Sequence, residues 1–454
     1  MSDVARVVIA GGGFAGIYAA MYLDKTLARR SDIEVLLISR ENFILFTPML
    51  HEVAAGDLYP DDIAIPLRRI LGHVKVVGAE VESIDLSARR LSCVAGFRSV
   101  RREFDFDHLL LALGSETNFF NMEGVRDWAV TMKNLSDAAL LRNGLVACLE
   151  QAALESDRSS RRHWLTFVTA GGGFAGVETT GAVNDFVRET AHFYPSISEE
   201  EIRVVLIQPE DLLLPELGPE LGRYAERKLR ERKVEIIKGA RVASYDGSVV
   251  SLTNGRSIPS STLTWTAGVK PSAVIGSLPC EKERGRIRVN EYLAVPGFRR
   301  LWAAGDCAAV PDGKTRKFHP PTAQHGSREG LAAAKNIERA ILRRPLKPFR
   351  YKTIGLLASI GHHTGVAMVF GIKFSGFLAW WLWRSVYLAK LPGLAKKLRV
   401  IAAWTLDPFF GREIEQMLTV RDVEMLTARL ARVRNERHEA PGSSSGQGGE
   451  VPLH

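Results

Sequence analysis

Two seven-residue segments of this chain are identical and rich in glycine. Residues 10–16 and residues 170–176 both read AGGGFAG. In a strand–turn–helix unit, the first glycine of a GxGxxG pattern permits the tight turn. The second lets the backbone approach a pyrophosphate, and the third lets the helix pack closely on the strand. The pyrophosphate lies against free N–H groups at the helix N-terminus, where the helix dipole favours negative charge. The spacing therefore predicts two dinucleotide sites.

The elements that must position these turns are visible in the sequence. Apolar runs at 7–9 and 165–168 predict a strand before each turn, and the stretches 17–27 and 177–190 are compatible with a helix after it. A single GxGxxG is a weak signal, but two copies in the required context favour nucleotide binding. The glycines concerned are Gly11, Gly13 and Gly16 in the first copy, and Gly171, Gly173 and Gly176 in the second.

The second predicted strand of each unit, 33–38 and 202–207, ends where an Asp or Glu usually binds the adenosine ribose. Ser39 and Gln208 stand there instead. A hydroxyl still bonds a ribose, and Glu41 is nearby. A neutral amide does not repel the 2′-phosphate of NADPH, so we expect the second site to tolerate NADPH alongside NADH.

Two dinucleotides held side by side favour hydride transfer from a nicotinamide to a flavin. The segment 301–306 reads LWAAGD, an apolar strand that runs into Gly-Asp. An Asp at such a strand end can bind a ribityl hydroxyl and orient a flavin chain. Because Gly-Asp alone is a common turn, this segment supports a flavin only together with the two glycine turns.

The composition is that of a globular protein with several domains. A length of 454 residues predicts about three domains, and 46% apolar with 24% charged residues excludes a disordered or collagenous chain. Cys93, Cys148, Cys280 and Cys307 form no CxxC pair or metal-like cluster. We therefore expect small buried thiols, a reducing compartment and no metal site. We expect no signal peptide and no conventional spanning helix.

Positive charge is concentrated near the C-terminal end. The segment 339–406 holds twelve Lys and Arg and no Asp or Glu, whereas the whole chain has a net charge of +9. Four of the eight Trp lie there, at positions 380, 381, 383 and 404. Aromatic and basic residues without acids fit a helix that lies in the plane of an anionic membrane interface. A core helix or an oligomer interface, such as a homodimer, is the alternative. Nucleic acid is not expected, because no recognition motif is present.

From about residue 5 to residue 420 the chain resembles the type II (alternative, non-proton-pumping) NADH:quinone oxidoreductases, which are two-dinucleotide-domain flavoproteins. The order and spacing of the matching segments follow that family. They include VVIAGGGFAG (7–16), LFTPMLHEVAAGDL (45–58), DIAIPLR (62–68), LLLALGS (109–115), TAGGGFAGVE (169–178), TWTAGVKPS (264–272), LWAAGDC (301–307), PPTAQHGSREG (320–330) and GFLAWWLWRSVYL (376–388).

The resemblance implies a role for particular positions. Glu178 matches a glutamate near the nicotinamide, and Ala323 and Gln324 match the first half of an AQxxxQ quinone-site motif. Arg328 stands where the second glutamine is expected, so the acceptor pocket is expected to be built differently or to take another acceptor. FAD would be held by Gly11, Gly13, Gly16, Ser39, Arg40, Pro48, Gly114, Gly305 and Asp306, and NAD(P) by Gly171, Gly173, Gly176, Gln208, Ala267 and Gly268.

The expected fold is α/β, with two Rossmann-like dinucleotide-binding domains and a C-terminal amphipathic helical module for membrane association. The FAD domain is discontinuous (1–118 and 285–345), and the NAD(P) domain is inserted into it (119–284). The basic, Trp-rich region covers 346–437, and the Gly/Ser-rich tail 438–454 is expected to be disordered.

The expected activity is hydride transfer from NADH, or also NADPH, to FAD and then two-electron transfer to a membrane quinone, without proton pumping. Such an enzyme would be a peripheral protein on the cytoplasmic face of the inner membrane. A disulfide reductase fits poorly, because no cysteine pair follows the first turn. Sulfide:quinone oxidoreductases, soluble ferredoxin or rubredoxin reductases and a slow redox sensor remain as alternatives.

Overall fold

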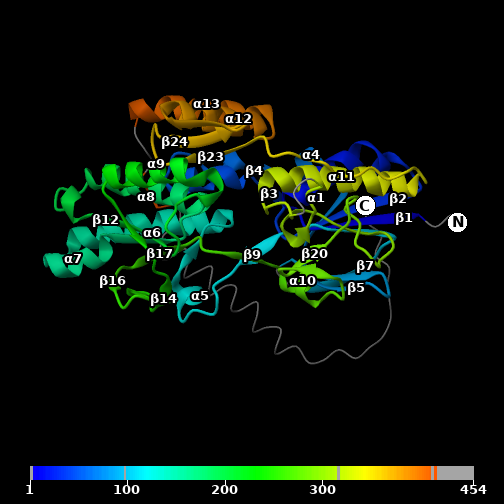
Figure 1. The fold of residues 1–454 in the computed structure, drawn as a ribbon, viewed down its shortest axis with the longest axis horizontal. Helices are drawn as coiled ribbons and strands as arrows, with labels where there is room; N and C mark the ends of the chain where they lie inside the picture. Colours follow the sequence, from blue (N-terminus) through cyan, green and yellow to red (C-terminus); the bar gives the residue numbers. More distant parts are fainter. Residues whose placement is uncertain (1–3, 97–98, 314–316, 411–413, 417–454) are drawn as a thin grey trace.

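The computed structural model describes residues 4–96, 99–313, 317–410 and 414–416. Two α/β units lie side by side, and a smaller C-terminal module lies along one edge of both (Figure 1). The chain passes between the units more than once, so segments far apart in the sequence meet at their junction.

The first unit is built on a sheet with the strand order β21-β8-β1-β2-β5-β6-β7 in the described chain. Strand β21 pairs in parallel with β8 although it lies far along the sequence, so the chain leaves this unit and returns to it. The strands are β1 (Ala5–Ala10), β2 (Ile33–Ser39), β5 (Lys75–Asp85), β6 (Arg90–Ala95), β7 (Val100–Asp105), β8 (His108–Leu111) and β21 (Leu301–Ala303).

Helices α1 (Phe14–Lys25) and α11 (Ala323–Ile341) pack against each other in this unit. Their approach is close: a Cβ added at Gly330 would lie 1.9 Å from the carbonyl oxygen of Ala15. The apolar run that predicted the first strand forms the fully buried part of β1. Burial on both faces is typical of a central parallel strand and explains the continuous apolar run.

The second unit contains a parallel sheet with the strand order β10-β17-β11-β12-β13 among the described residues. Its strands are β10 (Val130–Thr131), β11 (Thr166–Ala170), β12 (Arg203–Gln208), β13 (Val234–Lys238) and β17 (Thr262–Trp265), and its helices are α6 (Leu135–Leu154), α7 (Arg158–Trp164), α8 (Phe174–Ala191) and α9 (Gly218–Glu231). The strand–turn–helix order predicted for each glycine segment is confirmed, and each helix begins three residues earlier than expected.

Shorter elements complete the two units. They are β3 (Phe43–Leu45), β4 (Ala64–Pro66), β9 (Ser115–Thr117), β14 (Val242–Tyr245), β15 (Val249–Leu252), β16 (Ser257–Pro259), β18 (Val269–Pro271), β19 (Lys282–Glu283), β20 (Arg286–Arg288), β22 (Ala308–Ala309), α2 (Leu50–Ala54), α3 (Pro60–Ile63), α4 (Leu67–Ile70), α5 (Val125–Trp128), α10 (Ala273–Ser277) and the 3₁₀ turns at Leu27–Arg29, Thr47–Met49, Glu199–Glu201, Pro215–Leu217 and Gly305–Cys307.

The C-terminal module differs from the expected helical one, because its first part is a sheet. It starts with an antiparallel sheet of β23 (Gly355–Ser359), β24 (Gly365–Val369) and β25 (Ile372–Gly376), followed by α12 (Phe377–Lys390) and α13 (Leu394–Phe410). Glycines at strand ends take left-handed φ angles, +99° at Gly361 and +86° at Gly371, which suits tight hairpin turns. The predicted tail 438–454 lies outside the described residues. Within the described residues, no helix has the length and apolar character that crossing a membrane requires.

Candidate functional site

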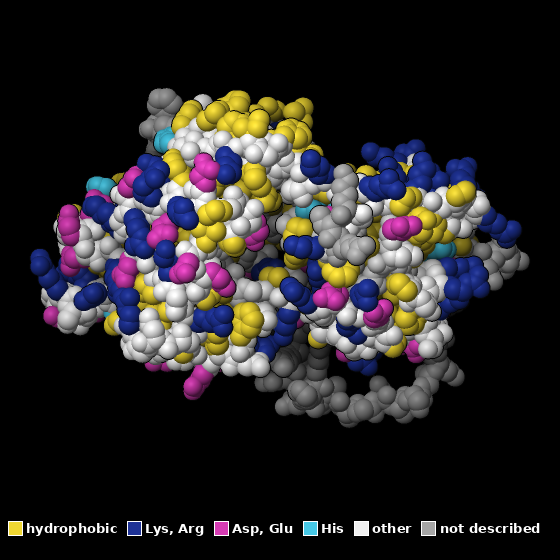
Figure 2. All heavy atoms as spheres, in the orientation of Figure 1, with side chains coloured by type: hydrophobic (Ala, Val, Ile, Leu, Met, Phe, Trp, Pro, Cys, Tyr) yellow, Lys and Arg dark blue, Asp and Glu magenta, His cyan; other side chains and the backbone are white. Residues whose placement is uncertain are grey.

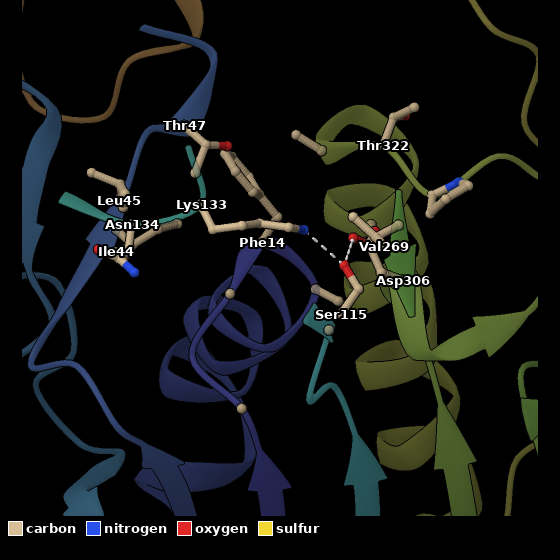
Figure 3. A pocket seen from close by; sticks show the side chains of 18 of the residues that line it. Phe14, Ile44, Leu45, Thr47, Ser115, Lys133, Asn134, Val269, Asp306 and Thr322 are labelled. Carbon is tan, nitrogen blue, oxygen red and sulfur yellow. Dashed lines mark hydrogen bonds between the residues drawn. The ribbon is translucent and has the colours of Figure 1, made fainter. Parts of the chain in front are cut away.

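A cavity of about 1200 Å³ lies at the junction of the two units and the C-terminal module. This volume exceeds the roughly 300–1,000 Å³ of a pocket for one drug-sized ligand. Its wall includes the first glycine turn, the start of α8, the start of α11 and the end of α12. Figure 3 shows part of this wall, with side chains from several separate segments around one space. The cavity therefore joins both predicted nucleotide regions and the predicted acceptor region.

The first glycine turn has the geometry that its sequence predicts. Gly11 has a φ of +111°, and a Cβ there would lie 2.2 Å from the carbonyl oxygen of Ala112. A Cβ at Gly16 would lie 1.7 Å from the carbonyl oxygen of Gly11, so the helix can approach the strand only without a side chain. Gly13 is the N-cap residue of α1 and lines the cavity. A Cβ added at Gly13 would have no neighbour within 4 Å. The backbone is thus open where a phosphate would lie.

The second turn repeats this geometry closely. Gly171 has the same φ of +111°, and a Cβ at Gly176 would lie 1.7 Å from the carbonyl oxygen of Gly171. Gly173 caps α8 and also has open space beside it. Of this unit, Phe174 at the start of α8 lines the large cavity, but the three glycines do not. The pyrophosphate end of this predicted site therefore lies outside the wall of the cavity.

The two strand-end positions are both engaged in hydrogen bonds. Ser39 Oγ donates to the backbone oxygen of Glu41 at 2.7 Å. Gln208 Oε1 accepts from the N–H of Gly172 at 2.6 Å, and Gln208 Nε2 donates to the carboxylate of Glu210 at 2.6 Å. Gln208 leaves the second ribose position itself without an acid. The structure places Glu210 beside that position, two residues after the strand end, just as Glu41 follows Ser39.

The Gly-Asp segment after β21 faces the first glycine turn. Asp306 lines the cavity, and its carboxylate accepts a hydrogen bond from Ser115 Oγ at 2.8 Å. Lys133 Nζ donates to the same hydroxyl at 3.0 Å (Figure 3). Burial lowers the pKa of Lys133, while the charges of Asp306 and Asp137 oppose that shift. Lys133 was not predicted, because it lies in a connecting segment without a motif.

Glu178 is a buried carboxyl that lines the cavity from α8. Its Oε1 accepts hydrogen bonds from Trp383 Nε1 at 2.9 Å and from the N–H of Ser359 at 3.2 Å. Burial raises the pKa of Glu178 to about 8, although both hydrogen bonds act in the opposite direction. Because Ser359 lies at the end of β23 and Trp383 in α12, the C-terminal module itself holds this acid in place.

A second buried carboxyl, Glu52 in α2, lies in the same region and was not predicted. Burial raises its pKa, and Trp404 Nε1 donates to it at 3.1 Å. The neighbouring His51 lines the cavity, with its Nδ1 3.9 Å from a carboxylate oxygen of Glu178. Burial lowers the pKa of His51 to about 4, so this imidazole is neutral at physiological pH. Burial thus favours the neutral form of each of these groups: the protonated carboxyls of Glu178 and Glu52, and the unprotonated imidazole of His51.

Gln324 and Arg328 lie one helical turn apart at the start of α11, and both line the cavity. Gln324 Nε2 donates to the backbone oxygen of Gly355 at 3.2 Å, and Tyr351 Oη donates to Gln324 Oε1 at 3.1 Å. The guanidinium carbon of Arg328 lies 4.5 Å from the centre of the Tyr351 ring, and its Nη1 donates to the backbone oxygen of Gln324 at 2.9 Å. The segment before the C-terminal sheet therefore fixes both side chains.

The structure brings together most of the predicted residues, but not all. Those that line the cavity are Gly11, Gly13, Ser39, Arg40, Pro48, Gly114, Glu178, Gly268, Gly305, Asp306, Gln324 and Arg328. Gly16, Gly171, Gly173, Gly176, Gln208 and Ala267 are absent from that wall. Gly16 and Gly176 act in helix–strand packing, for which no contact with a ligand is needed.

The cysteines carry no redox site in this structure. Cys93, Cys148, Cys280 and Cys307 are all buried as free thiols, as expected. Burial raises the pKa of Cys307 to about 12, which keeps it protonated and unreactive. A disulfide exchange mechanism therefore has no support from these residues.

Two α/β units with matching glycine turns, joined by one large cavity without a cysteine pair, define a dinucleotide-dependent oxidoreductase of the flavoprotein type. The family model described as pyridine nucleotide-disulphide oxidoreductase matches residues 5–330, and the model of the NDH2 C-terminal domain matches residues 354–413.

Similarity to individual proteins indicates the family within this class. The chain is 32% identical to the type II NADH:quinone oxidoreductase NdhA of Mycobacterium tuberculosis, over 94% of this chain and 91% of that protein. It is 31% identical to a probable NADH dehydrogenase of Dictyostelium discoideum, over 90% of each chain. The NDH2 structure from Plasmodium falciparum in complex with NADH superposes with a TM-score of 0.84 at 20% identity, over 91% of this chain and all of that one. The chain belongs to the type II NADH:quinone oxidoreductase family.

Proposed function

We propose that this protein transfers hydride from NADH to FAD and then two electrons to a membrane quinone, without pumping protons. The observation that carries this proposal is the continuous cavity that reaches from the first glycine turn past α8 to Gln324 and the end of α12. Such a space allows a donor and an acceptor to approach the same redox group. Membership of the type II family supports the same reaction.

FAD fits the first unit. The backbone at Gly11 and Gly13 would hold the pyrophosphate at the N-terminus of α1, and Asp306 would bind the ribityl chain. Ser39 and Arg40 would lie at the ribose, while Pro48, Gly114 and Gly305 would border the ring and chain. Once bound, FAD supplies the two-electron chemistry. The chain's own contribution is to hold and orient it. Ser115 donates to the Asp306 carboxylate, and Lys133 donates to the Ser115 hydroxyl.

NADH fits the second unit. Its pyrophosphate would lie at the N-terminus of α8, next to Gly171 and Gly173, and Ala267 and Gly268 would pass close to the nucleotide. Glu210, held by the amide of Gln208, would face the adenosine ribose. A carboxylate there repels a 2′-phosphate, so we propose a preference for NADH over NADPH. Glu178 would lie near the nicotinamide as a neutral, protonated carboxyl.

The acceptor would enter beside Gln324 and Arg328, below the C-terminal module. Reduction of a quinone to a quinol consumes two electrons and two protons. Glu178 has a raised pKa and lines the cavity, so its carboxyl holds a proton at neutral pH. We therefore propose that Glu178, itself buried, keeps a proton available at the wall of the cavity.

We propose that the C-terminal module binds an anionic membrane surface as a peripheral contact, on the cytoplasmic face. A hydrophobic crest lies over α12 and α13 (Figure 2). Exposed apolar side chains of the module include Leu394 at 73% on α13, Trp381 at 54% on α12 and Phe370 at 80% between β24 and β25. Lys396 and Lys397 follow Leu394 on α13, and basic residues next to exposed apolar ones fit a membrane interface. Trp380 and Trp383 are buried instead, so the core interpretation is right for those two. A homodimer that covers this face is the alternative.

Steady-state turnover tests the proposed function. The detergent-purified, FAD-loaded protein should oxidise NADH with a short-chain quinone at a rate of the order of 1 to 1,000 per second. Turnover with sulfide as the donor, or nucleotide binding without quinone turnover, would favour the sulfide-dependent enzyme or the redox sensor. Sedimentation with vesicles that contain phosphatidylglycerol, compared with gel filtration in detergent, separates membrane binding from dimer formation.

A further inference from the structure

Two cations face the acceptor end of the cavity. Arg328 comes from α11, Lys390 is the last residue of α12, and both line the cavity wall. Among the residues that the structure describes, neither makes an ion pair within 4.0 Å. Several half-buried cations elsewhere in the described chain do have a carboxylate partner, such as Arg188 with Glu199 and Arg232 with Asp185. The acceptor end of the cavity therefore holds two cations that have no carboxylate partner among the described residues.

Arg328 is held in place without being neutralised. Its guanidinium stacks over the Tyr351 ring, and one N–H donates to the backbone oxygen of Gln324. A guanidinium has five N–H donors, so most of them stay available to a ligand. The stacked ring restricts the rotation of the side chain, which reduces the entropy lost when a ligand binds. Arg328 is thus a preorganised donor group.

The two cations also act on each other. Burial lowers the pKa of Lys390, and the charge of Arg328 lowers it further. The same charge acts on Tyr18, a third lining residue, whose pKa burial raises and Arg328 lowers. No carboxylate contributes to either effect. A bound anion would relieve this repulsion, since each cation would gain a partner of opposite sign.

We propose that Arg328 and Lys390 form an oxyanion-binding pair at the acceptor site, which favours quinones that carry an anionic substituent. This inference rests on the proposed function. The neutral quinone accepts two electrons and one proton, and its product is a quinol monoanion whose negative oxygen would lie against the pair. One further proton from solvent completes the quinol, so NADH, one proton and quinone yield NAD⁺ and quinol. Arg328 occupies a position at which the family resemblance predicts an uncharged glutamine, so this property belongs to this chain.

Two matched acceptors test the proposal. Menadione is neutral, and a naphthoquinone sulfonate has a related ring with a fixed negative charge. For each protein, the readout is the ratio of kcat/KM for the sulfonate to kcat/KM for menadione. A charge-assisted hydrogen bond contributes on the order of 1.5–3 kcal/mol, so Arg328→Gln should lower this ratio about tenfold or more. Arg328→Lys, which keeps the charge, should retain most of the ratio.

The controls separate local charge from net charge and from lipid binding. Lys335→Gln removes an exposed cation from the same helix outside the cavity wall and should leave the ratio unchanged. The affinity of naphthalene sulfonate, a redox-inert anion, for the FAD-loaded protein should fall in parallel in Arg328→Gln. Binding to vesicles with phosphatidylglycerol should not change in that variant.

Each contrary outcome has a distinct meaning. An unchanged ratio in both Arg328→Gln and Lys390→Gln, with normal menadione turnover, would overturn the proposal while leaving the proposed function intact. A loss of vesicle affinity with an unchanged ratio would assign the cations to lipid headgroups and also overturn it. Failure of the wild-type protein to reduce any quinone would instead overturn the proposed function.

Discussion

Replacing Glu178 with glutamine tests the buried acid directly. Gln keeps the size of the side chain and a carbonyl oxygen that accepts from Trp383 and Ser359. The pKa of Glu178 rises from 4.5 to about 8 in the folded protein. Between these values the folded state holds a proton that the unfolded state has lost, so wild-type stability falls as pH rises. The slope is about 1.4 kcal/mol per pH unit, or about 5 kcal/mol over the whole window.

The Glu178→Gln variant has no such proton to lose. Its free energy of unfolding should be close to that of wild type near about pH 5 and exceed it progressively up to about pH 8. Urea unfolding of the FAD-loaded protein, followed by tryptophan fluorescence at several pH values, measures this difference. Glu189→Gln, an exposed position on the same helix, should keep the wild-type slope. An identical pH dependence in wild type and Glu178→Gln would refute the account of a protonated Glu178.

Three further predictions concern the nucleotide sites and the membrane face. Gly16→Ala places a Cβ 1.7 Å from a backbone oxygen, so α1 must move; FAD retention after gel filtration should fall, with a loss of stability of about 1–3 kcal/mol. Glu210→Gln should raise kcat/KM for NADPH relative to NADH about tenfold, and an unchanged ratio would remove Glu210 from the ribose site. Replacing Trp381 and Leu394 by Glu should weaken vesicle binding at least tenfold, as measured by sedimentation, while equal sedimentation would favour a different membrane contact.

Local sequence signals predicted the parts of the fold that local physics determines. The two AGGGFAG segments correctly placed a strand, a turn and a helix, because a left-handed φ and a close helix–strand approach both require glycine. Asp306 was found because it follows an apolar strand that runs into Gly305. The buried thiols followed from the absence of any cysteine pairing pattern. These features depend on neighbours within a few residues.

Features that depend on distant parts of the chain were missed. Lys133 lies outside the matching segments. Glu52 lies within the segment 45–58, but only the folded chain shows that it is buried close to the cavity. Glu210 was overlooked because the expected ribose position is the strand end, whereas the Gln208 amide holds the acid from two residues further on. The strands at 355–376 were hidden because glycine-bounded apolar runs of five residues do not distinguish a helix from a strand by periodicity alone.

The most direct test of the central claim is an anaerobic flavin titration. The purified protein should show a visible flavin spectrum that bleaches on addition of NADH and returns when a short-chain quinone is added. Bleaching without return would contradict the assignment of quinone as the acceptor. A protein that contains no flavin, and cannot be reconstituted with FAD, would contradict the account of the first glycine turn and of the cavity beside it.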